Sequence, residues 1–154
     1  MAYQIDQSNK IEQTNKDTVL ALSNSIQCSV KITSKTKRQA QEMFRMNGES
    51  RVFVFKTFAA GIYLLLKNSN IKQGKIIIDI EYPGRDKQIK LHVENMLSEN
   101  EKNKIEITFK PIGKSSPAHN LAYKVSTGKN SADKIISLKE IRDCFRSKTK
   151  SRGV

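Results

Sequence analysis

The sequence predicts an α/β domain in which helices flank a mixed β-sheet. Short runs rich in β-branched and aromatic residues alternate with amphipathic stretches that follow the period of an α-helix. At 154 residues, with no internal repeat and no long linker, the chain is expected to form one domain with one core. Five runs have the character of strands: residues 18–24, 27–33, 51–56, 75–82 and 104–112.

The N-terminal third predicts a hairpin followed by a helix. Residues 18–24 and 27–33 are β-like runs, and the Asn-Ser pair between them suits a hairpin turn. A helix is expected from Ser34, which can cap its first turn, through Asn47. Gly48 is expected to end this helix because glycine tolerates a left-handed backbone.

The next three elements are expected to supply much of the core. Residues 51–56 are rich in valine and phenylalanine, as strands are. The run 58–68 is apolar nearly all round, which predicts a helix in the core or against the sheet. Residues 75–82 predict an isoleucine-rich strand, which Pro83-Gly84 ends.

The C-terminal half adds a helix, a strand and two further helices. Residues 86–97 are amphipathic and begin with an acid, which suits the helix dipole. Residues 104–112 alternate between apolar and polar side chains, so one face of this strand is expected to be solvated. Ser116 and the proline after it predict a helix start, and a capping box at Ser137 predicts the last helix.

Both ends of the chain are predicted to lie outside the domain, which then spans residues 17–146. Residues 1–16 are rich in polar side chains and have little to bury, so a flexible N-terminal arm is expected. Residues 147–154 contain three basic residues and no acid, which predicts a basic C-terminal tail.

The charge balance predicts a polyanionic partner. Lysine and arginine number 28 against 15 acids, and this net charge of +13 favours nucleic acid, DNA or RNA, over an anionic membrane. No apolar run reaches 18 residues and the N-terminus lacks the apolar core of a signal peptide, so a cytoplasmic location is expected. Cys28 and Cys144 lie far apart with no Cys-x-x-Cys motif, which argues against structural zinc.

Two carboxylates stand near the C-terminal end of the isoleucine-rich strand. Because strand side chains alternate between faces, Asp79 and Glu81 are expected to point the same way. An acid in such a strand is costly unless it is paired, hydrogen-bonded or bound to a metal. Hard oxygen ligands in a strongly basic protein predict a Mg²⁺ or Mn²⁺ site beside a phosphate backbone. The alternative is a strand near an edge whose acids are solvated or paired with lysine or arginine.

The predicted elements follow the order strand, strand, strand, helix, strand, helix, strand, helix, with an extra helix after the second strand. This order resembles the ribonuclease H-like fold. Ribonuclease H, the Holliday-junction resolvases and the retroviral-type integrases share this fold. The resemblance covers roughly residues 18–127 and implies a mixed five-stranded sheet. It also implies two divalent ions, held by an acid on the first strand, an acid at the end of the fourth, and an acid or histidine on the last helix. Asp79 or Glu81 would be the fourth-strand acid, and His119 would open the last helix.

One part of this pattern is missing from the predicted elements. The predicted first strand, residues 18–24, has no acid at its centre or end, and Asp17 lies at its start. Two hypotheses therefore stay open. The first is a metal-dependent nuclease-like domain that hydrolyses phosphodiester bonds in structured or duplex nucleic acid. The second is a non-catalytic nucleic-acid-binding or assembly protein on the same fold. A homodimer or a larger complex is left open by the sequence.

Two further features lie around the predicted helix start. His119 is expected in the first turn, where a neutral imidazole can take a proton from water or ligate a metal; the alternative is that it covers Tyr123. The backbone N–H groups of residues 113–116, together with Lys114, can cradle a phosphate at the helix N-terminus. The alternative for this segment is an ordinary strand–helix loop.

Basic residues cluster around the helix predicted over residues 34–47. This cluster is the best candidate for a face that binds phosphates, the alternative being a solvated lysine-rich surface. The predicted nucleic-acid-binding residues are Lys35, Lys37, Arg38, Arg45, Arg51 and Lys114. The predicted catalytic residues are Asp79, Glu81 and His119, and the first two are also the predicted metal ligands.

Overall fold

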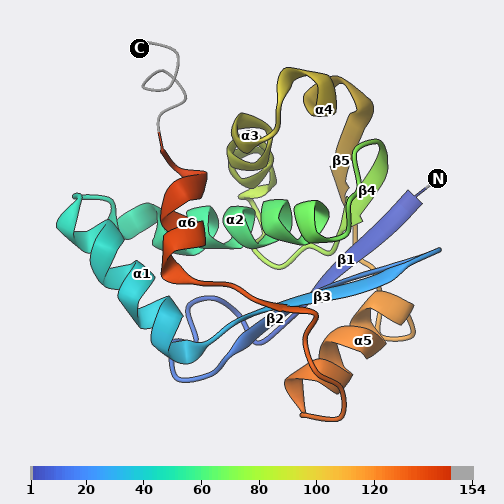
Figure 1. Cartoon of the computed structure of the whole chain (residues 1–154), viewed down its shortest axis with the longest axis horizontal. Coiled ribbons are helices and arrows are strands. Elements are labelled where there is room, and N and C mark those ends of the chain that lie inside the picture. The colour runs from blue at the N-terminus through green and yellow to red at the C-terminus, as the bar shows by residue number, and fades with distance from the viewer. Residues whose placement is uncertain (1, 147–154) are drawn as a thin grey trace.

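The computed structural model describes residues 2–146, which form a mixed six-stranded sheet with helices on both faces (Figure 1). The strands follow the spatial order β5-β4-β1-β2-β3-β6. Their bounds are β1 Ala2–Ser8, β2 Thr18–Ser23, β3 Gln27–Ile32, β4 Gly74–Ile78, β5 Ile105–Phe109 and β6 Lys134–Ile135. The helices are α1 Ser34–Met46, the 3₁₀ turn η1 Ser50–Val52, α2 Phe53–Asn68, α3 Asp86–Met96, α4 Glu99–Lys104, α5 Pro117–Ser126 and α6 Leu138–Cys144.

Strand β1 lies inside the sheet and joins its two halves. It pairs antiparallel with β2, which continues antiparallel into β3. On its other side β1 pairs parallel with β4, and β4 pairs parallel with β5. The carboxyl ends of β1, β4 and β5 therefore meet at one edge, the place where open α/β sheets bind ligands.

The two faces of the sheet are covered unequally. Figure 1 shows α1, α2, α3 and α6 on one side and α5 on the other. The large face holds the main core, in which Ile5, Leu20 and Leu65 are fully buried. The face under α5 holds a small apolar cluster of Val19, Ala21, Ala122 and Val125.

The predicted N-terminal arm is wrong for residues 2–8, because this segment is β1. Only Ile5 gives it an aliphatic side chain for the main core, so its composition resembles that of a disordered segment. It is ordered by the backbone ladders to β2 and β4 on its two sides. Pairing with neighbouring strands decides the state of such a segment more than its own propensity does.

The predicted strand over residues 51–56 is also wrong. Ser50–Val52 form the 3₁₀ turn η1, and the helix α2 begins at Phe53, five residues before its predicted start. The buried side chains of Phe53 and Thr57 continue at helical spacing into the apolar run that follows. Burial of this face outweighs the β-propensity of valine and phenylalanine. The sheet thus has six strands rather than five, since β1 and β6 are added and this one is lost.

Several local predictions are confirmed. Strands β2 and β3 form the expected hairpin. Ser116 caps α5 with proline at the first position, and Ser137 forms the expected capping box with Glu140 on α6. Thr33 rather than Ser34 caps α1.

Two sequence predictions concern membranes and the C-terminus. Within residues 2–146, none of the helices has the length and apolar character needed to cross a membrane. The predicted basic tail, residues 147–154, lies outside the described residues.

Candidate metal centre

The pairing register of β1 and β4 places two aspartates side by side. Ile5 lies opposite Ile78 in this parallel pair, and both side chains point into the main core. The residue that follows in each segment, Asp6 after Ile5 and Asp79 after Ile78, therefore points to the other face of the sheet, toward α5. The backbone N–H of Asp79 donates to the carbonyl of Ile5 at 3.0 Å, so the ladder continues one residue past the end of β4.

Glu81 completes a group of three acids, which we call the carboxylate cluster (Asp6, Asp79 and Glu81). One carboxylate oxygen from each residue lies within 4.8 Å of the others. Glu81 lies in the segment that follows β4. The backbone of this segment is held by a residue that does not belong to β4. Lys10 Nζ donates to the Glu81 carbonyl at 3.1 Å, and the next residue, Tyr82, is buried.

The carboxylate cluster has little positive charge to balance it. In the described part of the chain, none of its three acids forms an ion pair with lysine or arginine. Burial, followed by the charges and hydrogen bonds of Asp6 and then Asp79, raises the pKa of Glu81 to about 9. Three acids that repel one another in a half-buried site are costly to ionise without a cation.

Hydrogen bonds fix the two aspartates. Asp6 is 4% exposed, and its Oδ1 accepts from the backbone N–H of Gln7 at 2.8 Å. Its Oδ2 lies 2.8 Å from Nδ1 of His119, in the first turn of α5. Asp79 Oδ1 accepts from the backbone N–H of Ile112 at 2.8 Å. The carboxylates are thereby oriented by groups that lie outside the carboxylate cluster.

The helix that carries His119 is anchored to β1. Ser116 Oγ, at the N-cap of α5, donates to Gln4 Oε1 at 2.8 Å. The imidazole is 36% exposed, so one side faces Asp6 and the other reaches solvent. With Nδ1 facing Asp6, Nε2 is the atom left to meet a water or a ligand. The predicted alternative, a histidine that only covers Tyr123, does not account for the contact with Asp6.

The donor set fits a hard divalent cation. Carboxylate oxygens are the ligands of Mg²⁺, Mn²⁺ and Ca²⁺ in proteins, and oxygens on opposite sides of one such ion are roughly 4–5 Å apart. The three oxygens of the carboxylate cluster lie within this span. The arrangement can therefore hold a metal ion. His119 contacts Asp6 and is not one of the three acids' partners around that ion.

The sequence prediction thus found three of the four residues in the site and missed Asp6. Asp79 and Glu81 lie together, and His119 is connected to them through its contact with Asp6. A signal for Asp6 was present in the sequence. Apolar and polar residues alternate from Tyr3 to Asp6, and Asp6 directly follows Ile5, the aliphatic residue of this run. Its first-strand position became visible only when β1 proved to be a strand.

The predicted phosphate-binding residues divide into three groups. Lys37 is fully buried, and its ammonium donates only to groups inside the protein, so its assignment to a phosphate-binding surface is wrong. Arg45 is exposed but pairs with Glu42 on the same helix. The remaining exposed side chains are Lys35, Arg38, Arg51 and Lys114, of which Arg38 donates to the carbonyl of Thr14.

Lys114 is the predicted cation that lies close along the chain to a group in contact with the carboxylate cluster. It follows Ile112, whose N–H binds Asp79, by two residues. It also lies in the turn before α5, where Gly113 adopts a φ of +87°. Lys35, Arg38 and Arg51 belong to α1 and η1, on the other face of the sheet.

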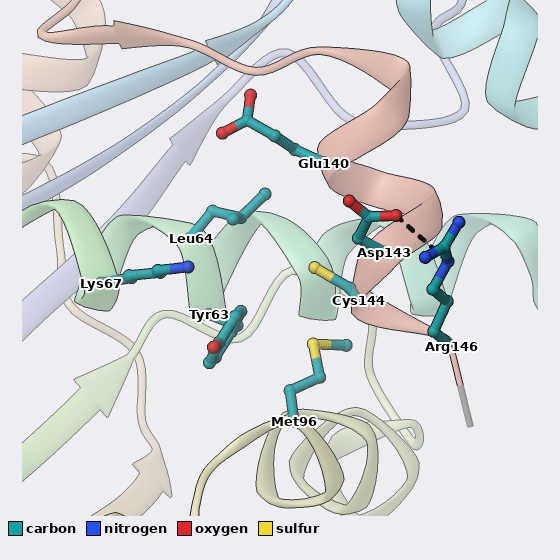
Figure 2. A pocket seen from close by; sticks show the side chains of 8 residues that line it. All are labelled: Tyr63, Leu64, Lys67, Met96, Glu140, Asp143, Cys144 and Arg146. Carbon is teal, nitrogen blue, oxygen red and sulfur yellow. Dashed lines mark ion pairs between the residues drawn. The ribbon is translucent and has the colours of Figure 1, made fainter. Parts of the chain in front are cut away.

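A separate cavity of about 280 Å³ lies between α2, α3 and α6, on the face opposite α5. Figure 2 shows Tyr63, Met96 and Cys144 around it. Burial raises the pKa of the Cys144 thiol to about 12, so a reactive thiolate is not available there. The acids on its rim, Glu140 and Asp143, are paired with lysine or arginine. Neither a thiolate at Cys144 nor an unpaired acid at Glu140 or Asp143 is therefore present in this cavity.

The fold and the site define a mixed α/β protein with an Asp-Asp-Glu group that can hold a metal ion. Comparison with protein-family models, with curated proteins and with solved structures finds no match to this chain.

Proposed function

We propose that this protein is a metal-dependent nuclease of the ribonuclease H-like fold that hydrolyses phosphodiester bonds in structured or duplex nucleic acid. The observation that carries the proposal is the convergence of Asp6, Asp79 and Glu81 in a chain of net charge +13. A strongly basic protein attracts a polyanion, and an acidic cluster within it is best explained by a cation that acts on that polyanion.

The corrected element order supports this proposal. Three strands, a helical segment, β4, α3, β5 and α5 follow one another with the short helix α4 inserted before β5. Apart from α4, this is the order that the resemblance to the ribonuclease H-like fold requires. Asp6 stands on the first strand, Asp79 directly follows the fourth, and His119 opens the helix after the fifth. The acid that the predicted elements lacked is present, which removes the main argument for the non-catalytic alternative.

Each residue of the site has a distinct role in this proposal. Asp6, Asp79 and Glu81 hold Mg²⁺ or Mn²⁺, which when bound polarises the phosphodiester and lowers the pKa of a water. His119, oriented by Asp6, presents Nε2 for transfer of a proton to or from the reacting oxygens. Lys114 and the N-terminus of α5 attract a phosphate beside the carboxylate cluster.

The test is cleavage of labelled duplex, hybrid and branched substrates in Mg²⁺ and Mn²⁺. We expect cleavage by the wild type and its loss in Asp6→Asn and Asp79→Asn. Glu106→Gln is the matched control, because it removes one negative charge from an exposed position on β5. Tight, salt-sensitive binding without cleavage by the wild type would overturn the proposal in favour of a non-catalytic binding protein. Absence of any affinity for nucleic acid would favour an assembly protein.

A further inference from the structure

Lys37 is a buried cation for which the proposed function has no direct use. It lies on α1 and is 0% exposed. Its Nζ donates to the carbonyls of Lys10 and Gln13, at 3.2 and 2.6 Å, and to Thr18 Oγ1 at 2.9 Å. An ammonium has three protons, so all of its donor capacity is used by these acceptors.

All three acceptors lie in one loop or directly after it. Lys10 and Gln13 lie in the β1–β2 loop, residues 9–17, and Thr18 is the first residue of β2. Thr18 Oγ1 also donates to the carbonyl of Asn9 at 2.9 Å, which ties the two ends of the loop together. Buried loop carbonyls need such donors, and a single side chain supplies them here.

The other side of the β1–β2 loop contacts the segment that carries Glu81. Lys10 Nζ donates to the carbonyl of Glu81 at 3.1 Å. The backbone N–H of Ile11 donates to the hydroxyl of Tyr82 at 3.0 Å, and this hydroxyl lies 3.3 Å from Gln7 Oε1 on β1. The segment that carries Glu81 is thus held by two consecutive residues of a loop that Lys37 fixes.

We propose that Lys37 is a positioning residue for the proposed metal centre, acting through the β1–β2 loop to hold Glu81 beside Asp6 and Asp79. The inference rests on the proposed function, since it assigns Lys37 a role in metal binding at that same site. Lys37 itself pairs with none of the three carboxylates in the described part of the chain. Its effect is therefore on the geometry of the carboxylate cluster and not on its charge.

A role in positioning differs from a role in folding through its effect on metal affinity. Outer groups that orient metal ligands change metal affinity roughly 10–100-fold when they are removed. A side chain that only stabilises the fold changes the melting temperature and leaves the affinity of the folded protein unaltered. Lys37→Met keeps the length of the side chain and removes the donors, so it separates the two effects.

The experiment is calorimetric titration of the full chain with Mn²⁺, well below the melting temperature of each variant. We expect Lys37→Met to weaken Mn²⁺ binding about tenfold. The matched control is Ile141→Val or Ile141→Ala, whichever shows the same loss of melting temperature, because Ile141 is buried on α6 away from the carboxylate cluster. The control should bind Mn²⁺ as the wild type does.

Tyr82→Phe tests the same connection from its other end, because it removes the hydroxyl that binds Ile11. We expect Tyr82→Phe to cause a similar loss of Mn²⁺ affinity. In the double variant the loss of affinity should be smaller than the product of the two single losses, because both changes release the same loop. If Lys37→Met does not fold, the Tyr82→Phe affinity decides. Wild-type binding with unchanged affinity in the variants would overturn the role of Lys37 alone. Absence of Mn²⁺ binding by the wild type would overturn the metal centre itself.

Discussion

Asp6→Asn is the substitution that tests the carboxylate cluster most directly. The change removes one of three negative charges and keeps the shape of the side chain. An asparagine Oδ1 can still accept the hydrogen bond from the backbone N–H of Gln7. The fold is therefore expected to survive, while the proposed metal centre loses one of its three charged ligands.

The expected magnitude follows from ligand linkage. A cation present at 100 times its dissociation constant stabilises the wild type by about 2.7 kcal/mol. For a domain of this size each kcal/mol raises the melting temperature by roughly 2–4 °C, so the wild type should gain roughly 5–11 °C. If the substitution weakens binding about 100-fold, the same cation concentration contributes only about 0.4 kcal/mol, or roughly 1–2 °C.

The pH dependence of the metal-free protein gives a second readout. The pKa of Glu81 is about 9 in the fold and 4.5 without perturbation, so the folded state holds a proton that the unfolded state releases. This contribution to stability is complete below pH 4.5 and is lost as the pH rises toward 9. Asp6→Asn removes the second and third causes of the shift and leaves burial and the two contributions of Asp79, so the decline with pH should become shallower.

Thermal unfolding with and without Mg²⁺ or Mn²⁺, between pH 5 and 9, measures both effects. Glu106→Gln serves as the control, because it changes charge equally at an exposed site and should keep the wild-type shift. A melting-temperature gain in Asp6→Asn equal to that of the wild type would refute the assignment of Asp6 as a ligand. Equal melting temperatures of the wild type in metal-containing and metal-free buffers would refute the site as a whole.

Three further predictions address other parts of the molecule. His119→Gln is expected to bind Mn²⁺ with nearly wild-type affinity, because the glutamine amide can still donate to Asp6. It should cleave at least 10²-fold more slowly, because it lacks the proton-transferring group; equal rates in a cleavage assay would exclude that role. Burial lowers the pKa of Lys37 to about 8 from 10.5, so its contribution makes the fold more stable as the pH rises from 8 to 10.5. Because the Glu81 contribution is common to both proteins, urea unfolding should show the stability of the wild type rising relative to that of Lys37→Met between pH 8 and pH 10. Gly61→Ala is expected to lower stability by about 1–3 kcal/mol, because the new methyl group meets the fully buried Leu20; unchanged urea unfolding would show that Leu20 can move aside.

Much of the fold follows from local signals in the sequence. The hairpin of β2 and β3, the caps of α5 and α6, and the strand before Asp79 depend on turn residues, capping residues and an isoleucine run. These signals act within a few residues, so a sequence displays them directly. The start of α2 was missed because valine and phenylalanine favour strands, whereas the buried face that selects a helix depends on the neighbouring sheet.

The site was only half predictable, because its geometry is set by a register between distant strands. Asp79 and Glu81 are visible in the sequence since two acids in an isoleucine-rich run are unusual. Their meeting with Asp6 depends on the pairing of Ile5 with Ile78, which are 73 positions apart (78 − 5). A single sequence contains no local signal for such a pairing.

The missed strand and the missed acid have one cause. β1 was taken for an arm because it is polar, yet several of its polar side chains belong to the site or support it. Asp6 is a ligand in the proposed centre, Gln4 anchors α5, and Gln7 meets Tyr82 beside Glu81. A strand that serves a site departs from the apolar pattern expected for its position in the sheet, and such conflicts between local pattern and fold are expected at functional sites. In this chain, the polarity that resembled disorder is therefore an argument for the site, and Asp6→Asn tests that argument at the residue where the conflict is greatest.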